Sequence, residues 1–180
     1  MNKNGKRKAE QLMLHLANKL QHQSNYCFVL LNKLFWHIDN LHYAKFGESV
    51  THFGYVKKPQ GPTPDPHVFY PFIRKMAASG WLKEVEEIAI NGRVQKKVLA
   101  LKEAKMELFS GEELKVIERV VSEMRNFTGT GASEDSHTYT SWKVAKLGEA
   151  MPFESYSLTH TVPTPDDIKW SKDEAAKRAV

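Results

Sequence analysis

The chain has 180 residues, of which 41% are hydrophobic and 26% are charged. The length indicates one domain that can bury a hydrophobic core without disulfides or metal ions, and the composition is that of an ordinary soluble protein. No apolar run approaches the roughly 20 residues of a membrane helix, and the single cysteine, Cys27, excludes an internal disulfide. We therefore expect a soluble, cytoplasmic protein.

The formal net charge of +5 is concentrated at the N-terminus. Lys3, Lys6, Arg7 and Lys8 contribute four of the five charges, and the rest of the chain has 22 basic and 21 acidic residues. Residues 1–8 are therefore predicted to form a flexible basic arm in front of a nearly neutral domain. A contact with nucleic-acid phosphates would fall to this arm.

Two apolar helices are predicted in the first fifty residues. The first begins at Ala9 and carries three leucines on one face, at Leu12, Leu16 and Leu20. The second covers residues 26–46, is capped by Ser24 or Asn25, and ends at Gly47. Its apolar stripe is wide, so we place this helix in the centre of the core.

A proline-rich segment follows the long helix. Residues 48–64 are predicted to be extended, and the run Gly61–Pro64 to form a rigid, non-helical turn, because proline fixes φ and restricts the residue before it. Asp65 followed by a proline is a typical helix start. A helix is therefore predicted up to Ser79, with a kink or a split at Pro71.

Residues 85–99 have the pattern of a small β-hairpin. The pair Asn91-Gly92 favours a two-residue type I′ turn. That turn sets three residue pairs opposite each other, Glu87–Lys96, Glu86–Lys97 and Val85–Val98. The charge pairs predict this register, because a slip by one residue turns every side chain to the other face.

The chain after the hairpin is predicted to be helical with one interruption. Ser110 and Glu113 form a capping box at the start of a helix that continues to Met124. The stretch 128–140 is polar and contains glycine, so we expect a loop there, with at most a weak helix from Ser133.

The sequence therefore predicts a mainly α (α+β) fold. A compact helical domain, residues 9–157, surrounds the central helix and includes a short helix over 142–147. Residues 158–180 form a C-terminal tail, in which Thr164 caps a short helix up to Ala176.

No catalytic or metal-binding arrangement is evident. His37 and His42 are five residues apart and lie on different faces of a helix, and Asp39 supplies only a second ligand beside His42, fewer than a metal site needs. The run Asp135-Ser136-His137 has the residue types of a hydrolase triad, but contiguous residues do not converge as triad members do. We therefore expect no enzyme activity, no cofactor and no metal.

A DNA-binding regulator of the winged-helix type is the alternative function. Helices followed by a hairpin can form a winged helix, with Arg93, Lys96 and Lys97 on the wing. Three glutamates on the opposite strand cancel these charges, so a salt-paired, solvent-facing ribbon is favoured over a DNA contact. Many aromatic residues lie between positions 28 and 81. Aromatic side chains in excess of what the core needs suit a protein interface, so this segment favours a protein-binding function over a DNA-binding one.

The segment from residue 31 to residue 64 combines motifs that resemble a known family. Its elements are Leu31-Asn32-Lys33-Leu34-Phe35-Trp36-His37-Ile38-Asp39, Leu41-His42-Tyr43, Phe46-Gly47, Val50-Thr51, Tyr55-Val56 and Gly61-Pro62-Thr63-Pro64. Later markers are the acidic helix after Ser110, the pair Ser136-His137, Trp142 and Pro152-Phe153-Glu154. Together they are similar to the Panacea antitoxin domain, a SocA-like family associated with phages and genetic elements. Residues 128–135 depart from it, because the family has a leucine-containing helix there.

The resemblance implies a non-enzymatic antitoxin that neutralises, by direct binding, a cognate protein toxin encoded by the neighbouring gene. Some relatives resemble adaptors that hand the toxin to a protease, so a protease or a chaperone is an implied further partner. DNA stays an alternative partner, and no membrane contact is expected.

Ten residues of the motifs are candidates for partner binding or for shaping the domain. They are Lys33, Trp36, Asp39, His42, Tyr43, Tyr55, Lys57, Gly61, Pro62 and Pro64. Trp36 is expected in the core, while Lys33 and Asp39 are expected to hold neighbouring segments. The rigid Gly61–Pro64 loop is expected to present Tyr55 and Lys57 to a partner. Structural support is an equally good interpretation for all ten.

Overall fold

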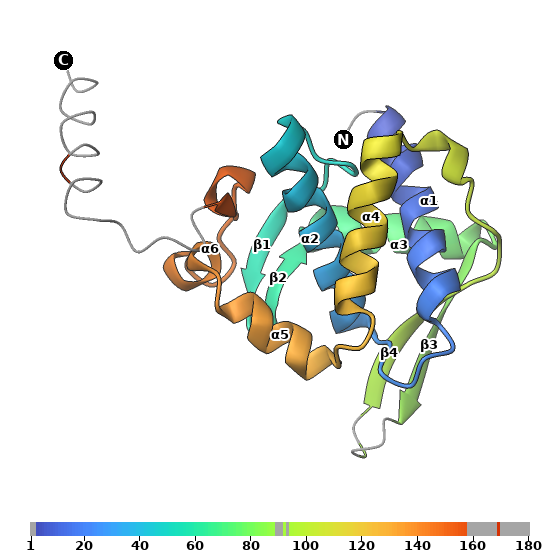
Figure 1. The fold of residues 1–180 in the computed structure, drawn as a ribbon. Coiled ribbons are helices and arrows are strands. Elements are labelled where there is room, and N and C mark those ends of the chain that lie inside the picture. The colour runs from blue at the N-terminus through green and yellow to red at the C-terminus, as the bar shows by residue number, and fades with distance from the viewer. Residues whose placement is uncertain (1–2, 89–91, 93, 158–168, 170–180) are drawn as a thin grey trace.

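The computed structural model describes residues 3–88, 92, 94–157 and 169. The fold is mainly α with small β elements, as predicted (Figure 1). Among the described residues, no helix is both long and apolar enough to cross a bilayer. The elements are α1 (Lys3–Leu20), α2 (Phe28–Phe46), β1 (Tyr55–Lys58), β2 (Gly61–Pro64), α3 (Pro66–Ala78), β3 (Leu82–Ile88), β4 (Val94–Ala100), a 3-10 turn (Met106–Leu108), α4 (Gly111–Met124), α5 (Gly129–His137), α6 (Thr140–Val144) and a second 3-10 turn (Phe153–Ser155). The predicted terminal helix lies outside the described residues.

Helix α2 runs through the middle of the molecule, between α4 on one side and the β1–β2 sheet on the other (Figure 1). Every residue from Leu30 to Asn40 is buried, which confirms the predicted central position. The helix ends at Gly47 with φ 77°, as predicted, but its N-cap is Cys27 rather than Ser24 or Asn25. The side chain of Asn25 instead donates to two backbone carbonyls ahead of α5.

Helix α1 buries the three leucines of its predicted stripe. It begins at Lys3 rather than at Ala9, so residues 3–8 are helical and not an irregular arm. Lysine is a good helix former, and the Lys8 ammonium forms an ion pair of 2.6 Å with the buried carboxylate of Glu113. This contact attaches the first turns of α1 to the start of α4.

The run Gly61–Pro64 forms a strand and not the predicted turn, because it pairs antiparallel with β1. Proline lacks the amide hydrogen that would pair with the neighbouring strand. It is tolerated here because the residue opposite each proline forms its backbone hydrogen bonds with a different segment. Lys57, opposite Pro62, exchanges backbone hydrogen bonds with residues 148 and 149, and the carbonyl of Tyr55, opposite Pro64, accepts from residue 151. Strand β1 therefore lies between β2 and the segment 148–151.

Helix α3 starts as predicted, with the Asp65 side chain accepting a hydrogen bond of 2.9 Å from the His67 amide. It continues through Pro71 to Ala78 in one piece, so the helix is not split. Pro71 removes the amide that would bond to the His67 carbonyl, and both residues lie on the exposed face, where water can replace that partner.

Strands β3 and β4 form the predicted hairpin, but the predicted register is wrong by one residue, since Glu86 lies opposite Lys96. The observed ion pairs join Lys96 to Glu86 at 3.5 Å and Lys97 to Glu87 at 2.6 Å. Both strands carry two like charges in succession, so opposite charges still meet after a slip of one residue. The predicted Asn91-Gly92 turn falls largely outside the described residues.

The capping box of α4 is present as predicted, whereas the loop predicted over 128–140 is wrong. Helix α5 covers Gly129–His137 and starts at Thr128, whose side chain accepts from the Gly131 amide. Its small residues allow close packing on α2, since a side chain at Gly129 would meet the sulfur of Cys27 at 2.7 Å. Tertiary contact therefore overrides the weak helix propensity of this segment.

Candidate functional site

Lys33 points from α2 into the protein and meets the backbone of β2. Its side chain is only 1% exposed, and its Nζ donates a hydrogen bond of 2.7 Å to the carbonyl of Pro62. Burial lowers the pKa of Lys33 to about 7, because the interior disfavours the charged ammonium. The residue therefore joins the central helix to the Gly61–Pro64 strand, the segment-holding role predicted for it.

Gly61 lies where a side chain would be both strained and crowded. Its φ is 93°, and a Cβ placed on it would come within 2.2 Å of the Ser136 hydroxyl and 2.9 Å of the Lys33 side chain. The strand β2 thus approaches α2 and α5 more closely than a side chain would permit. This contact explains the glycine of the Gly-Pro-x-Pro motif in physical terms.

Asp39 is completely buried and accepts three hydrogen bonds at its carboxylate. The donors are the Thr51 amide at 2.8 Å, the Thr51 hydroxyl, and the Tyr55 hydroxyl at 2.7 Å. Burial raises the pKa of Asp39, while the three donors act against this shift. The group fixes the segment before β1 on the central helix.

Tyr55 is 2% exposed, so the expectation that a loop presents it to a partner is wrong. Successive side chains of a strand face opposite sides, and the Tyr55 ring is on the inner side of β1. There its hydroxyl donates a hydrogen bond to the Asp39 carboxylate.

The C-terminal half of α2 is tied down by two further motif residues. The ring Nδ1 of His42 donates to the Glu48 carbonyl at 2.6 Å. The hydroxyl of Tyr43 donates to the Glu154 carboxylate at 2.5 Å, and its ring stacks on Phe153 at 4.9 Å between centroids. The Pro-Phe-Glu marker of the sequence therefore meets Tyr43 of the His-Tyr pair in space.

Trp36 belongs to the core, as predicted, and forms an aromatic cluster whose other members the sequence did not indicate. Tyr139 and Tyr156 pack edge-on against it, with centroids 4.9 and 5.3 Å away. His37 lies 3.2 Å from the Tyr156 hydroxyl through Nδ1 and 3.6 Å from the Asp135 carboxylate through Nε2. Burial lowers the pKa of His37, and the nearby carboxylate opposes this shift.

Lys57, another of the ten candidate residues, lies on β1 and is half-buried. Its Nζ donates to the Ala145 carbonyl at 2.8 Å and lies 4.1 Å from the centre of the Trp142 ring. Trp142 also stacks on His137, with the centroids 3.8 Å apart. Lys57 and the markers His137 and Trp142, which are far apart in the sequence, thus meet at α6. The hydrogen bond from Lys57 holds the backbone at Ala145, directly after this helix.

The run Asp135-Ser136-His137 does not form a triad. Asp135 faces His37, Ser136 donates to the Ser133 carbonyl at 2.7 Å, and His137 stacks on Trp142. In the described part of the chain, no group of three or more His, Cys, Asp or Glu side chains is arranged to hold a metal ion.

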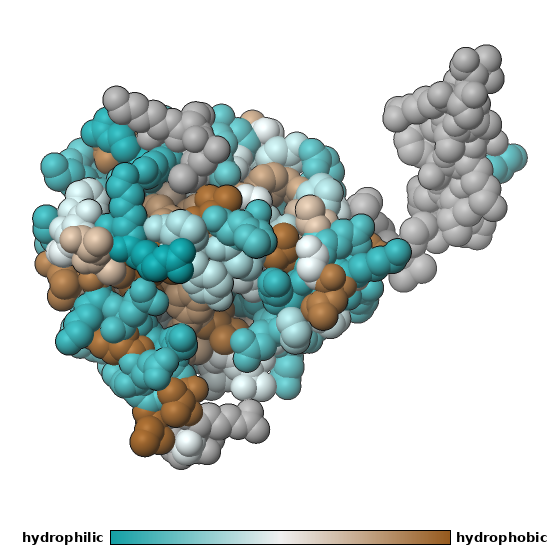
Figure 2. All heavy atoms as spheres, turned by 180° about the vertical axis from the view of Figure 1, so that it is seen from behind, coloured by the Kyte–Doolittle hydropathy of each residue, from teal (hydrophilic) through white to brown (hydrophobic). Residues whose placement is uncertain are grey.

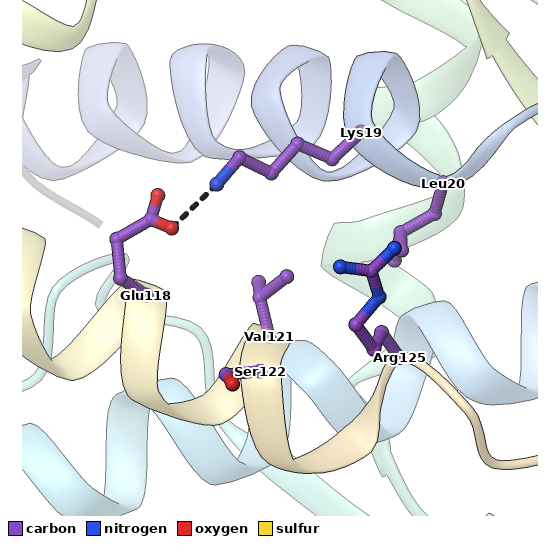
Figure 3. Close-up of a pocket in the computed structure, with 6 residues that line it drawn as sticks. All are labelled: Lys19, Leu20, Glu118, Val121, Ser122 and Arg125. Atoms are coloured by element: carbon purple, nitrogen blue, oxygen red, sulfur yellow. Dashed lines mark hydrogen bonds and ion pairs between the residues drawn. The ribbon is translucent and has the colours of Figure 1, made fainter.

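Two pockets of the described surface lie away from the motif residues. One of about 340 Å³ opens between α1 and α4, where Lys19 points toward Glu118 and forms an ion pair of 2.5 Å (Figure 3). The other, of about 270 Å³, lies between α1 and the segment after β4. Neither contains any of the ten candidate residues.

Two of the three cations predicted for a DNA-binding wing are paired with glutamates, and the third, Arg93, lies outside the described residues. Lys97 is buried and paired with Glu87, and Lys96 is paired with Glu86. The contacts match the salt-paired ribbon of the sequence interpretation rather than a basic wing.

The family model described as "Antitoxin SocA-like, Panacea domain" matches residues 31–143, more than half of the chain. The chain therefore belongs to the SocA-like Panacea family. No curated protein and no solved structure matches it.

Proposed function

We propose that this protein is an antitoxin that neutralises a cognate protein toxin by binding it directly. The observation that carries the proposal is the family match over residues 31–143, which spans α2 to α6. Membership in an antitoxin family supports a toxin as the partner in general, and direct binding is the simplest mode for a small domain without other matched segments.

The contacts of the polar motif residues support a binding role over a catalytic one. Lys33, Asp39 and His42 are buried, and each makes hydrogen bonds within the chain. Polar groups that are satisfied in this way stabilise one conformation. They hold a rigid domain whose outer surface is left for a partner.

The test is co-expression with the product of the gene adjacent to this one. We expect the adjacent product to stop growth alone, growth to recover with the wild-type chain, and the two proteins to elute as one complex. Gly61→Val, which should not fold, serves as the negative control. If growth stays arrested and the proteins elute separately, the proposal is wrong.

Delivery to a protease predicts a different result in the same cells. Direct binding leaves the amount of toxin unchanged while growth recovers, whereas delivery lowers it. Immunoblotting of a tagged toxin, in cells with and without the wild-type chain, separates the two modes. An unchanged toxin level with recovered growth is the result that we expect.

A further inference from the structure

The segment after α6 forms a tight turn with a leucine at its tip. The amide of Glu149 donates to the Lys146 carbonyl at 2.9 Å, which closes a four-residue turn. Gly148 has φ 84°, the left-handed value that a type II turn needs at its third position. Leu147 therefore occupies the second position, where the side chain leaves the body of the protein.

This turn is fixed to β1 at several points. Lys57 donates from its Nζ to the Ala145 carbonyl and from its amide to the Glu149 carbonyl, and its own carbonyl accepts from the Gly148 amide. The Glu149 carboxylate also accepts from the Lys146 amide at 2.6 Å. A surface held in this way loses little conformational entropy when it binds a partner.

The end of α6 and the turn together expose two apolar residues and two cations. Val144 is 73% exposed and Leu147 is 68% exposed, and the side chains of Lys143 and Lys146 next to them are also exposed. Residues 136–148 contain no acidic side chain, and the carboxylate of the next residue, Glu149, accepts a hydrogen bond from the Lys146 amide within the turn. On the side of the molecule where α6 lies, hydrophobic residues stand among hydrophilic ones (Figure 2). We call Lys143, Val144, Lys146 and Leu147 the turn surface.

A second exposed apolar pair lies at the end of the hairpin but lacks these properties. Ile88 and Val94 are opposite each other and are 77% and 66% exposed. The neighbouring charges, Glu86 and Lys96, neutralise each other. Arg93, next to Val94, lies outside the described residues, so this pair serves as a control for exposed apolar area.

We propose that the turn surface is the docking site for the toxin, and that the toxin contributes an apolar pocket bordered by carboxylates. This inference rests on the proposed function and specifies its partner surface. An apolar centre within a charged border is the usual arrangement of a binding hot spot. The lysines steer an acidic partner toward the site, and the rigid turn inserts Leu147.

The experiment compares three double variants in binding to the purified product of the adjacent gene. V144S/L147S removes the apolar pair, K143E/K146E reverses the charges, and I88S/V94S is the control at the hairpin. We expect V144S/L147S to weaken binding by about 30-fold, the size of a hot-spot truncation. K143E/K146E should weaken it more at low salt than at high salt, and I88S/V94S should bind like the wild type.

Thermal unfolding and the mass of each free protein are measured on the same samples. Unchanged melting temperatures show that the turn variants act on binding and not on folding. If the wild type binds and both turn variants bind equally well, the inference is wrong while the proposed function stands. The inference is also wrong if V144S/L147S only converts a self-associated form to a monomer. If the wild type does not bind at all, the proposed function fails and the docking site falls with it.

Discussion

The interior beneath β1–β2 and the turn surface beside it use charged residues in opposite ways. Lys33 and Asp39 are buried, and their polar atoms are bonded to backbone and side chains of the same chain. Lys143 and Lys146 are exposed beside two apolar residues. Substitutions in the first region should therefore change stability, and substitutions in the second should change binding at nearly constant stability.

The largest effect on stability is expected for Gly61→Ala. The new Cβ would overlap the Ser136 hydroxyl and the Lys33 side chain, at a φ that alanine rarely adopts. Overpacking and backbone strain together should lower the free energy of unfolding by about 3 kcal/mol or more. Denaturant titration measures this change. Gly54→Ala is the control, because nothing lies within 4 Å of a Cβ at that position, and equal stability of the two variants would contradict the predicted clash.

The second effect in size is expected for Asp39→Asn. If the new amide keeps its oxygen toward the Thr51 amide, its NH2 group faces the hydroxyls of Thr51 and Tyr55, whose own hydrogens then lose their carboxylate acceptor inside the protein. We expect a loss of about 2–3 kcal/mol in the free energy of unfolding. Tyr55→Phe is the graded control, since it removes one donor of the same network and should cost about 1 kcal/mol. If Asp39→Asn lowered the free energy of unfolding less than Tyr55→Phe does, the carboxylate would not be the main stabilising group of this network.

Lys33 should make stability depend on pH between its folded and unfolded pKa values. The pKa is about 7 in the folded protein and 10.5 in the unfolded chain. Between these values the unfolded chain binds more protons, so the free energy of unfolding rises with pH. Relative to Lys33→Met, the wild type should gain up to about 1.4 kcal/mol per pH unit between pH 8 and pH 9.5. Denaturant titrations at several pH values measure the difference, and parallel curves for the two proteins would mean that Lys33 keeps its ordinary pKa.

Local patterns in the sequence predicted the helices of the core but not the contacts that shape the site. The apolar stripe of α2 and the capping box of α4 depend on neighbouring residues, and both are confirmed. Helix α5 and the strand Gly61–Pro64 depend on tertiary contacts, which override the preferences of glycine and proline. The sequence likewise identified Asp39 and Tyr55 as special, but only their packing shows that Tyr55 faces inward.

The aromatic cluster around Trp36 shows why part of the site had no signal. Tyr139 and Tyr156 lie more than 100 residues after Trp36 in a polar region of the chain, and no periodicity links them to α2. Tyr139 follows α5, a helix for which the sequence predicted a loop with at most a weak helix from Ser133. Because α5 was not predicted, there was no basis in the sequence for placing these aromatic residues next to α2.

The smallest effect on stability is expected for Lys57→Met. Lys57 connects the interior beneath β1–β2 with the turn surface. The substitution keeps the apolar stem but removes the hydrogen bond to the Ala145 carbonyl and the contact with the Trp142 ring. Because the residue is half-buried, the free energy of unfolding should fall by only about 1 kcal/mol. The turn should loosen more than the fold does, so the amides of Gly148 and Glu149 should exchange hydrogen faster while those of α2 change little. Lys58→Met on the same strand is the control, and equal exchange in both variants would show that the Lys57 ammonium does not hold the turn. If exchange rises and toxin binding weakens together, the rigidity that the interior confers on the turn surface is part of its affinity.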